Sequence, residues 1–264
     1  MADRPILVLG ATGSTGRRVA ARLSGAGHAV RRASRRGDVR FDWSDRGTWS
    51  GALAGVERVY LMAPHELPVD PDFVHDAVAA GMRRFVLLST RGAAEMRDER
   101  LLAAEQLVRG SGVDWTVLRP DWFDQNFDEG FFRPAVLAGE LVLPLGDKRQ
   151  AFVDADDIAA VAVAALTEDG HEGLVHEVTG PEALSFPQAL AAITRVTGLR
   201  VGFRGTPDDY RAVVPADLAE QQIEAWDALD DGEPTDTVAR VTGREPKHFH
   251  DYVVQAWGSG AWRG

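Results

Sequence analysis

The chain has 264 residues, and its 29 lysines and arginines are outnumbered by 40 aspartates and glutamates, which gives a formal net charge of −11. An acidic surface repels phosphate backbones and anionic lipids, so neither a nucleic acid nor a membrane is an expected partner. Cysteine is absent, which excludes disulfide bonds and thiolate chemistry. No metal site is expected.

Length and hydropathy define the expected class of protein. A chain of this size suits one large α/β domain, or such a domain with a smaller substrate-capping lobe. The first apolar run starts by Pro5, and no apolar run is long enough to span a bilayer. We therefore expect a cytoplasmic protein that acts on a small molecule, and the sequence leaves its oligomeric state open.

The glycine-rich segment after the first apolar run predicts a nucleotide site. Residues 6–9 predict a buried strand, and the apolar pattern of residues 19–23 predicts a helix. Between them the spacing GxxGxxG permits a tight turn and close approach of a phosphate to the backbone. The free N–H groups of the helix's first turn favour a pyrophosphate. The alternative is a purely structural turn. The expected cofactor contacts in this loop are Gly10, Thr12, Gly13, Ser14, Thr15 and Gly16.

The end of the second predicted strand indicates which dinucleotide binds. Residues 28–34 form this strand, no acidic residue occupies its end, and Arg35 lies just beyond it. An acidic side chain there would bind both ribose hydroxyls and repel a 2′-phosphate, whereas an arginine pairs with that phosphate. NADP is therefore favoured over NAD, with a solvated surface arginine as the alternative.

Apolar runs then alternate with helical patterns along the chain, as in βαβ units. Residues 84–90 form one of these predicted strands, so Ser89 and Thr90 lie at its carboxyl end, where open α/β sheets bind ligands. Both are candidates for orienting a substrate. The pattern predicts a doubly wound, mainly parallel sheet. The other strands of this part are expected at residues 39–43, 56–62 and 113–118.

Beyond Pro120 the pattern becomes less regular. Residues 121–132 are rich in aromatic and acidic side chains and are expected to line a nicotinamide and a substrate. Asp154 is expected to cap a helix over residues 158–166. Strands at residues 141–145 and 150–153 are expected to return to the sheet, a further strand is expected at 174–178, and a helix at 186–196. We expect a cofactor domain over residues 1–153, with residues 154–264 giving the remaining sheet elements and a small, mostly helical C-terminal lobe.

The chain lacks an acid–base pair that many reductases use. In classical short-chain reductases a lysine four residues after a tyrosine lowers the tyrosine pKa, so that the phenol protonates a forming alkoxide. Here Tyr60, Tyr210 and Tyr252 are followed at that distance by proline, valine and alanine. Either the protein binds NADP without turnover, or its substrate needs little help from an acid. An iminium ion is such a substrate, and Asp121 is a candidate for stabilising its charge.

Several motifs extend this interpretation by resemblance. GATGSTGRRVA at 10–20, LLST at 87–90, SGVDWTVLRPDWFDQNF at 111–127 and FVDADDIAAVA at 152–162 resemble the NmrA-like branch of atypical short-chain dehydrogenases, which has a Rossmann-type fold. RFDWSDRGTW at 40–49, VERVYLMAP at 56–64, TGPEALSF at 179–186 and VTGREPKHFHDYV at 241–253 are similar to its agroclavine and festuclavine dehydrogenase subgroup, whose members reduce a cyclic iminium with NADPH.

The resemblance implies roles for individual residues. It implies phosphate contacts from the glycine loop, a 2′-phosphate contact from Arg35 and an adenine-side contact near Asp42. Many relatives have a lysine that reaches the nicotinamide ribose where this chain has Leu101, so ordinary carbonyl reduction is less expected. The nicotinamide contacts that it implies lie near Ala63, Ser89, Pro120 and Phe123.

The expected function is NADPH-dependent hydride transfer to a small, cyclic imine or iminium in a biosynthetic pathway. Two alternatives stay open. One is a regulator that senses NADP(H) without catalysis, and the other is an NADPH-dependent quinone or enone reductase.

Overall fold

A parallel sheet forms the centre of the molecule. The computed structural model describes residues 4–64 and 67–263, and within them seven strands pair in the order β3-β2-β1-β4-β5-β6-β9. Every pair is parallel. The strand order reverses between β1 and β4, which creates the crevice where such sheets bind ligands. The strands are β1 (Ile6–Leu9), β2 (Val30–Ser34), β3 (Val39–Arg40), β4 (Arg58–Met62), β5 (Arg84–Leu88), β6 (Asp114–Pro120) and β9 (Leu174–Val178).

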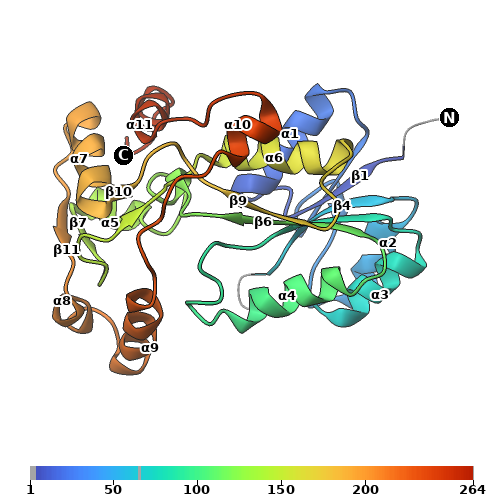
Figure 1. Ribbon diagram of the computed structural model, residues 1–264, viewed down its shortest axis with the longest axis horizontal. Coiled ribbons are helices and arrows are strands. Elements are labelled where there is room, and N and C mark those ends of the chain that lie inside the picture. The colour runs from blue at the N-terminus through green and yellow to red at the C-terminus, as the bar shows by residue number, and fades with distance from the viewer. Residues whose placement is uncertain (1–3, 65–66, 264) are drawn as a thin grey trace.

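Helices cover both faces of this sheet (Figure 1). One face packs against α1 (Ser14–Gly25), α6 (Ala155–Thr167) and α10 (Thr237–Thr242), and the other against α2 (Trp49–Leu53), α3 (Pro71–Ala79) and α4 (Glu99–Arg109). A strand enclosed in this way must be apolar on both sides, and all four residues of β1 are buried. The doubly wound α/β fold expected from the sequence is confirmed.

Two predicted strands do not join the main sheet. β7 (Glu140–Val142) pairs in parallel with β11 (Gly202–Arg204), and β8 (Arg149–Gln150) pairs antiparallel with β10 (Leu184–Ser185). The expectation that residues 141–145 and 150–153 return to the sheet is wrong, because β9 already occupies the edge beside β6.

Local details explain where other predicted elements begin and end. The third strand is shorter than expected, because the Asp42 carboxylate accepts a hydrogen bond from the Ser44 N–H and turns the chain ahead of η1 (Arg46–Thr48). Asp154 caps α6 as expected, since its carboxylate accepts from the N–H of Asp156 at 2.7 Å.

The C-terminal lobe is built around aromatic side chains. Its helices are α5 (Arg133–Ala138), α7 (Phe186–Thr197), α8 (Pro207–Arg211), α9 (Ala216–Asp227) and α11 (Phe249–Gly258), which lie beside the end of β6 in Figure 1. Phe127, Phe152, Phe186 and Phe249 are buried together in its core. The short helix η2 (Asp124–Asn126) leads from the sheet into this lobe.

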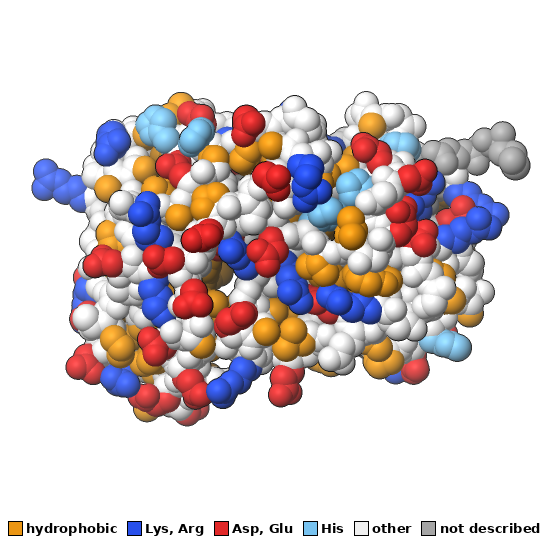
Figure 2. Space-filling view, viewed as in Figure 1, with side chains coloured by type: hydrophobic (Ala, Val, Ile, Leu, Met, Phe, Trp, Pro, Cys, Tyr) orange, Lys and Arg blue, Asp and Glu red, His pale blue; other side chains and the backbone are white. Residues whose placement is uncertain are grey.

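Charged side chains of both signs are mixed over the face shown in Figure 2, and hydrophobic patches there stay small. Within residues 4–64 and 67–263, no helix combines the length and the hydropathy that crossing a bilayer requires.

Candidate cofactor and substrate site

The glycine loop forms a tight turn between β1 and α1. Gly10 has a φ of +62°, a conformation that is energetically unfavourable for any residue with a side chain. Its carbonyl accepts a hydrogen bond from the Gly13 N–H at 2.8 Å. A Cβ at Gly16 would overlap the Gly10 carbonyl oxygen, so α1 approaches the strand this closely only because Gly16 has no side chain.

The start of α1 offers free backbone donors. The first helical bond runs from the Arg17 N–H to the Gly13 carbonyl, and Gly13 at the N-cap has no side chain to cap the turn. The N–H groups of Ser14, Thr15 and Gly16 therefore precede the helical ladder, as in the first turn of any α-helix. Together with the helix dipole, they suit a pyrophosphate.

Two hydroxyls of this turn already have protein partners. Thr15 is buried, and its Oγ1 accepts a hydrogen bond from the Tyr60 hydroxyl at 2.9 Å. The Ser14 hydroxyl donates to Glu129 at 3.1 Å. These bonds leave the backbone N–H groups of both residues, rather than their side chains, for a cofactor.

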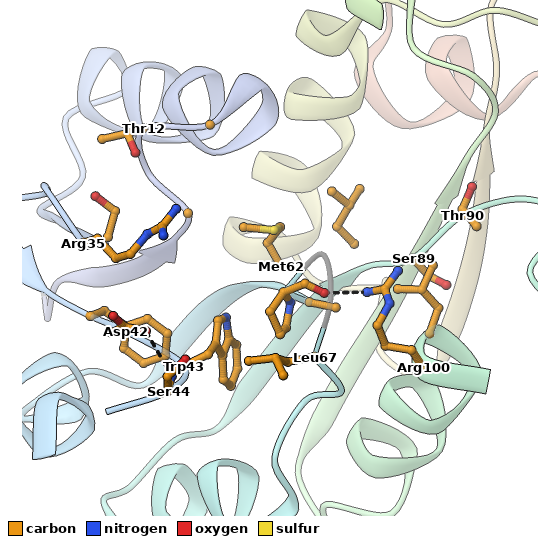
Figure 3. A pocket seen from close by; sticks show the side chains of 18 of the residues that line it. Thr12, Arg35, Asp42, Trp43, Ser44, Met62, Leu67, Ser89, Thr90 and Arg100 are labelled. Carbon is orange, nitrogen blue, oxygen red and sulfur yellow. Dashed lines mark hydrogen bonds between the residues drawn. The ribbon is translucent and has the colours of Figure 1, made fainter. Parts of the chain in front are cut away.

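A cavity of about 1160 Å³ extends from this loop along the carboxyl edge of the sheet. Figure 3 shows that its side chains come from both sides of the crevice, with Thr12 and Arg35 at one end and Ser89 and Arg100 at the other. Its size suits a dinucleotide with a small substrate. Among the described residues, the lining side chains with hydroxyl, carboxylate or guanidinium groups are Thr12, Ser34, Arg35, Arg36, Asp42, Ser44, Ser89, Thr90 and Arg100.

The end of the cavity near β2 is positively charged. Arg35 and Arg36 both line it and are exposed, and neither has a carboxylate partner among the described residues. Asp42 and Trp43 complete this end. Two unpaired guanidinium groups beside a pyrophosphate loop fit a further phosphate.

The opposite end contains a buried network centred on Glu105. Ser89 follows β5 and lines the cavity, and its hydroxyl donates to Glu105 Oε1 at 2.7 Å. Arg119 holds the same carboxylate with two hydrogen bonds, of 2.8 and 2.6 Å, and Arg109 donates to Oε2 at 3.2 Å. Burial alone would raise the pKa of Glu105, but the hydrogen bonds from Arg119 and Ser89 outweigh it and hold that pKa below its ordinary value.

Thr90 and Arg100 also lie at this end (Figure 3). The Thr90 hydroxyl donates to the carbonyls of Arg91 and Pro120. The Arg100 guanidinium donates to the Pro64 carbonyl at 2.8 Å and to Asp98 at 3.1 Å. Since a guanidinium has five N–H donors, these two bonds leave others for a ligand.

The other predicted contacts divide into two groups. Ala63 and Phe123 line the cavity, whereas Pro120 does not. Asp121 is also outside the lining residues, and its buried carboxylate accepts hydrogen bonds from the N–H groups of Trp122 and Ala151. Burial raises the pKa of Asp121. These contacts tie the end of β6 to the segment before α6, and they do not favour a catalytic role.

None of the chain's three tyrosines lines the cavity. Tyr60 is buried against Thr15, Tyr210 donates to Gln222 at 2.5 Å, and Tyr252 donates to Asp128 at 2.8 Å. No phenol is therefore placed to protonate a ligand there.

Sequence reasoning missed Arg100 as a site residue, together with the apolar lining side chains Met62 and Leu67. The one hint was the neighbouring Leu101, since the resemblance described above implies a lysine at that position. No local pattern indicates that the first turn of α4 directs Arg100 into the crevice.

The comparison with known proteins agrees with this geometry. Residues 10–169 match the model of an NAD(P)H-binding family. The chain is 36% identical to the (4-alkanoyl-5-oxo-2,5-dihydrofuran-3-yl)methyl phosphate reductase of Streptomyces griseus, and the match covers 95% of this chain and 97% of that protein. It is 34% identical to the oxidoreductase YesF of Bacillus subtilis, with 96% of both chains covered. With the agroclavine dehydrogenase of Claviceps fusiformis it shares 32% identity over 81% of both chains.

Solved structures show the same fold. The NADPH complex of the Escherichia coli quinone oxidoreductase QOR2 has a TM-score of 0.74 at 24% identity, covering 96% of this chain and 99% of that one. The transcriptional regulator NmrA, in complex with NAD, has a TM-score of 0.76 at 16% identity, covering 99% and 97%. The chain belongs to this NAD(P)H-binding family and is an NAD(P)H-dependent oxidoreductase.

Proposed function

We propose that the protein is an NADPH-dependent reductase that transfers hydride to a small, cyclic imine in its protonated, iminium form. NADPH, when bound, supplies the hydride. The amides of the Gly10 to Gly16 loop would hold its pyrophosphate, and Arg35 with Arg36 would hold its 2′-phosphate, because both guanidinium groups are free for it.

One observation carries the choice of substrate. The described residues that line the cavity include no tyrosine, lysine, histidine or glutamate, and the one aspartate among them, Asp42, lies at the β2 end, away from Ser89 (Figure 3). The Ser89 proton is engaged by Glu105, and the Thr90 proton by backbone carbonyls. A site without an available acid suits an acceptor that already carries its proton, and an iminium ion does.

The charge of the molecule supports the same substrate. A net charge of −11 attracts cations from a distance, and Figure 2 shows acidic side chains around a hollow on the half of the molecule that contains the C-terminal lobe. The resemblance to agroclavine dehydrogenase agrees with this chemistry.

A series of cyclic imines with different basicity tests the proposal. If the enzyme supplies no proton, the rate of NADPH oxidation reports the protonated fraction of the imine. The midpoint of the pH profile of kcat/KM then moves with the imine pKa across the series. A midpoint that stays fixed would reveal an enzyme acid and contradict the assignment. Absence of NADPH oxidation with every imine would also contradict it.

A second candidate is supported by Arg100. Hydride addition to a conjugated carbonyl creates an enolate, whose negative charge a nearby guanidinium stabilises. Arg100 lines the cavity and has N–H donors left for this purpose. The Streptomyces griseus relative, whose name describes an unsaturated lactone substrate with a phosphate group, agrees with this alternative. Enones and quinones therefore belong in the same assay.

A further inference from the structure

The Ser89 hydroxyl has only one proton, and it donates that proton in a hydrogen bond within the protein. Ser89 Oγ lies 2.7 Å from Glu105 Oε1. Glu105 is 3% exposed and is held by three further hydrogen bonds from two arginines. Arginine stays protonated at all relevant pH values, so the carboxylate remains an acceptor, and Ser89 must be the donor in this pair.

This arrangement fixes what Ser89 can offer the cavity. A hydroxyl has one donor and two acceptor lone pairs. With the proton directed to α4, the lone pairs of Ser89 are left for the cavity that it lines, and no described protein group donates to them. Ser89 is then an acceptor site beside Arg100, which is a donor site.

The position of Ser89 in the cavity indicates the partner. Thr12 of the pyrophosphate loop and Arg35 lie toward one end of the cavity, so the nicotinamide half of a dinucleotide is expected toward the other end, where Ser89 lies (Figure 3). The carboxamide of nicotinamide has an N–H donor in this half.

We propose that Glu105 is a positioning residue that makes Ser89 a hydrogen-bond acceptor for the carboxamide N–H of the nicotinamide. Ser89 then orients the ring and gives no proton to the substrate. This inference rests on the NADP(H) binding of the proposed function, but it does not depend on which acceptor is reduced.

Binding measured without substrate tests the assignment. The probes are NADP⁺ and its 3-acetylpyridine analogue, in which a methyl group replaces the amide nitrogen and removes the donor. Titration calorimetry with Ser89→Ala should show NADP⁺ bound about five- to tenfold more weakly, as expected for one lost hydrogen bond. Binding of the analogue should change less than twofold, because the analogue has no donor to lose.

Glu105→Gln gives the sharper result. Its amide nitrogen should face Ser89, because at the Oε1 position that nitrogen opposes one arginine donor, Arg119 Nε, whereas at the Oε2 position it would oppose two, Arg119 Nη2 and Arg109. Ser89 would now accept from the glutamine and turn its own proton to the cavity. NADP⁺ should bind about tenfold more weakly, whereas the analogue, which has only a carbonyl oxygen there, should bind as well as before or better.

Matched controls and rescue separate this effect from general damage. Ser111→Ala removes a hydroxyl that donates to the Val108 carbonyl just beyond α4, and Glu99→Gln neutralises an exposed carboxylate on α4. Neither should alter binding of either probe. Ser89→Thr keeps the hydroxyl and should prefer NADP⁺ to the analogue, as the unmodified protein does. It therefore tests the assignment even if Ser89→Ala folds poorly.

Each failure has a distinct meaning. If the unmodified protein does not bind NADP⁺, the proposed function itself fails. If it binds NADP⁺, but Ser89→Ala and Glu105→Gln weaken both probes equally or neither probe, only the assignment of Ser89 as an acceptor is overturned.

Discussion

A side chain at Gly16 would overlap the carbonyl oxygen of Gly10. The two residues belong to different elements, the start of α1 and the end of β1, and their contact sets how closely the helix approaches the sheet. The same contact directs the amides of the first helical turn toward the crevice.

Gly16→Ala should therefore impair both folding and cofactor binding. Since the overlap is with backbone, the helix must shift, at a cost of about 1–3 kcal/mol in the free energy of unfolding. NADP⁺ affinity should fall at least tenfold, measured by calorimetry together with thermal unfolding. The control is Gly25→Ala at the end of the same helix, where an added Cβ meets nothing within 4 Å. It should leave binding unchanged and raise stability slightly.

Removing the positive charge at the β2 end should change cofactor preference. Arg35→Ser together with Arg36→Ser should weaken NADPH binding at least tenfold and leave NADH binding nearly unchanged, because only NADPH has the 2′-phosphate. Arg40→Ser is the control, since Arg40 is exposed on β3 and outside the cavity. The assignment fails if Arg35→Glu leaves NADPH bound no less tightly than NADH.

Arg100→Met separates the two candidate substrates. A guanidinium stabilises a forming enolate and repels an iminium ion. The variant should lower kcat/KM at least tenfold for a conjugated carbonyl, whereas for an iminium kcat/KM should stay equal or rise. Steady-state assays with one substrate of each class measure the split. Arg83→Met, an exposed arginine at the other edge of the sheet, should affect neither substrate, and equal losses for both substrates would assign Arg100 to folding alone.

Asp124 should make stability depend on pH in a defined direction. Both oxygens of its carboxyl group are buried without a hydrogen-bond partner among the described residues. Burial and then the neighbouring Asp154 carboxylate raise the pKa of Asp124 well above the ordinary 3.8. The folded protein thus keeps a proton that the unfolded chain releases as pH rises past that value, so this residue costs stability increasingly toward neutral pH.

Asp124→Asn should remove that cost, because asparagine is neutral at every pH. Its free energy of unfolding at neutral pH should exceed that of the unmodified protein by more than about 1 kcal/mol, since one pKa unit corresponds to about 1.4 kcal/mol. The difference should shrink as pH falls toward 4. Urea denaturation at several pH values measures this. Asp76→Asn, at an exposed position of α3, should show no such trend, and a pH-independent gain from Asp124→Asn would contradict the explanation.

Much of this fold could be predicted because its determinants are local. The strand before Gly10, the glycine spacing and the cap at Asp154 each depend on residues within a few positions of one another. The sheet partners of β7 and β8 could not be predicted, since they depend on β9, β10 and β11 later in the chain.

The candidate site divides in the same way. Arg35 follows one predicted strand and Ser89 lies at the carboxyl end of another, so their positions at the crevice could be expected from the fold. Glu105 joins Ser89 across 16 positions and Arg119 across 14, and a sequence does not reveal how such groups share one proton. The isolation of the Asp124 carboxyl group likewise depends on the packing of distant segments.

The placement of β9 limits how the molecule can be divided. The chain leaves the sheet after β6, forms part of the C-terminal lobe, and only then supplies the last strand of the sheet. A fragment ending at residue 153 would retain the glycine loop but leave the long edge of β6 unpaired, and such an edge invites association with other chains. Engineered exchange of the lobe between relatives would therefore have to retain residues 154–178 with the nucleotide-binding part.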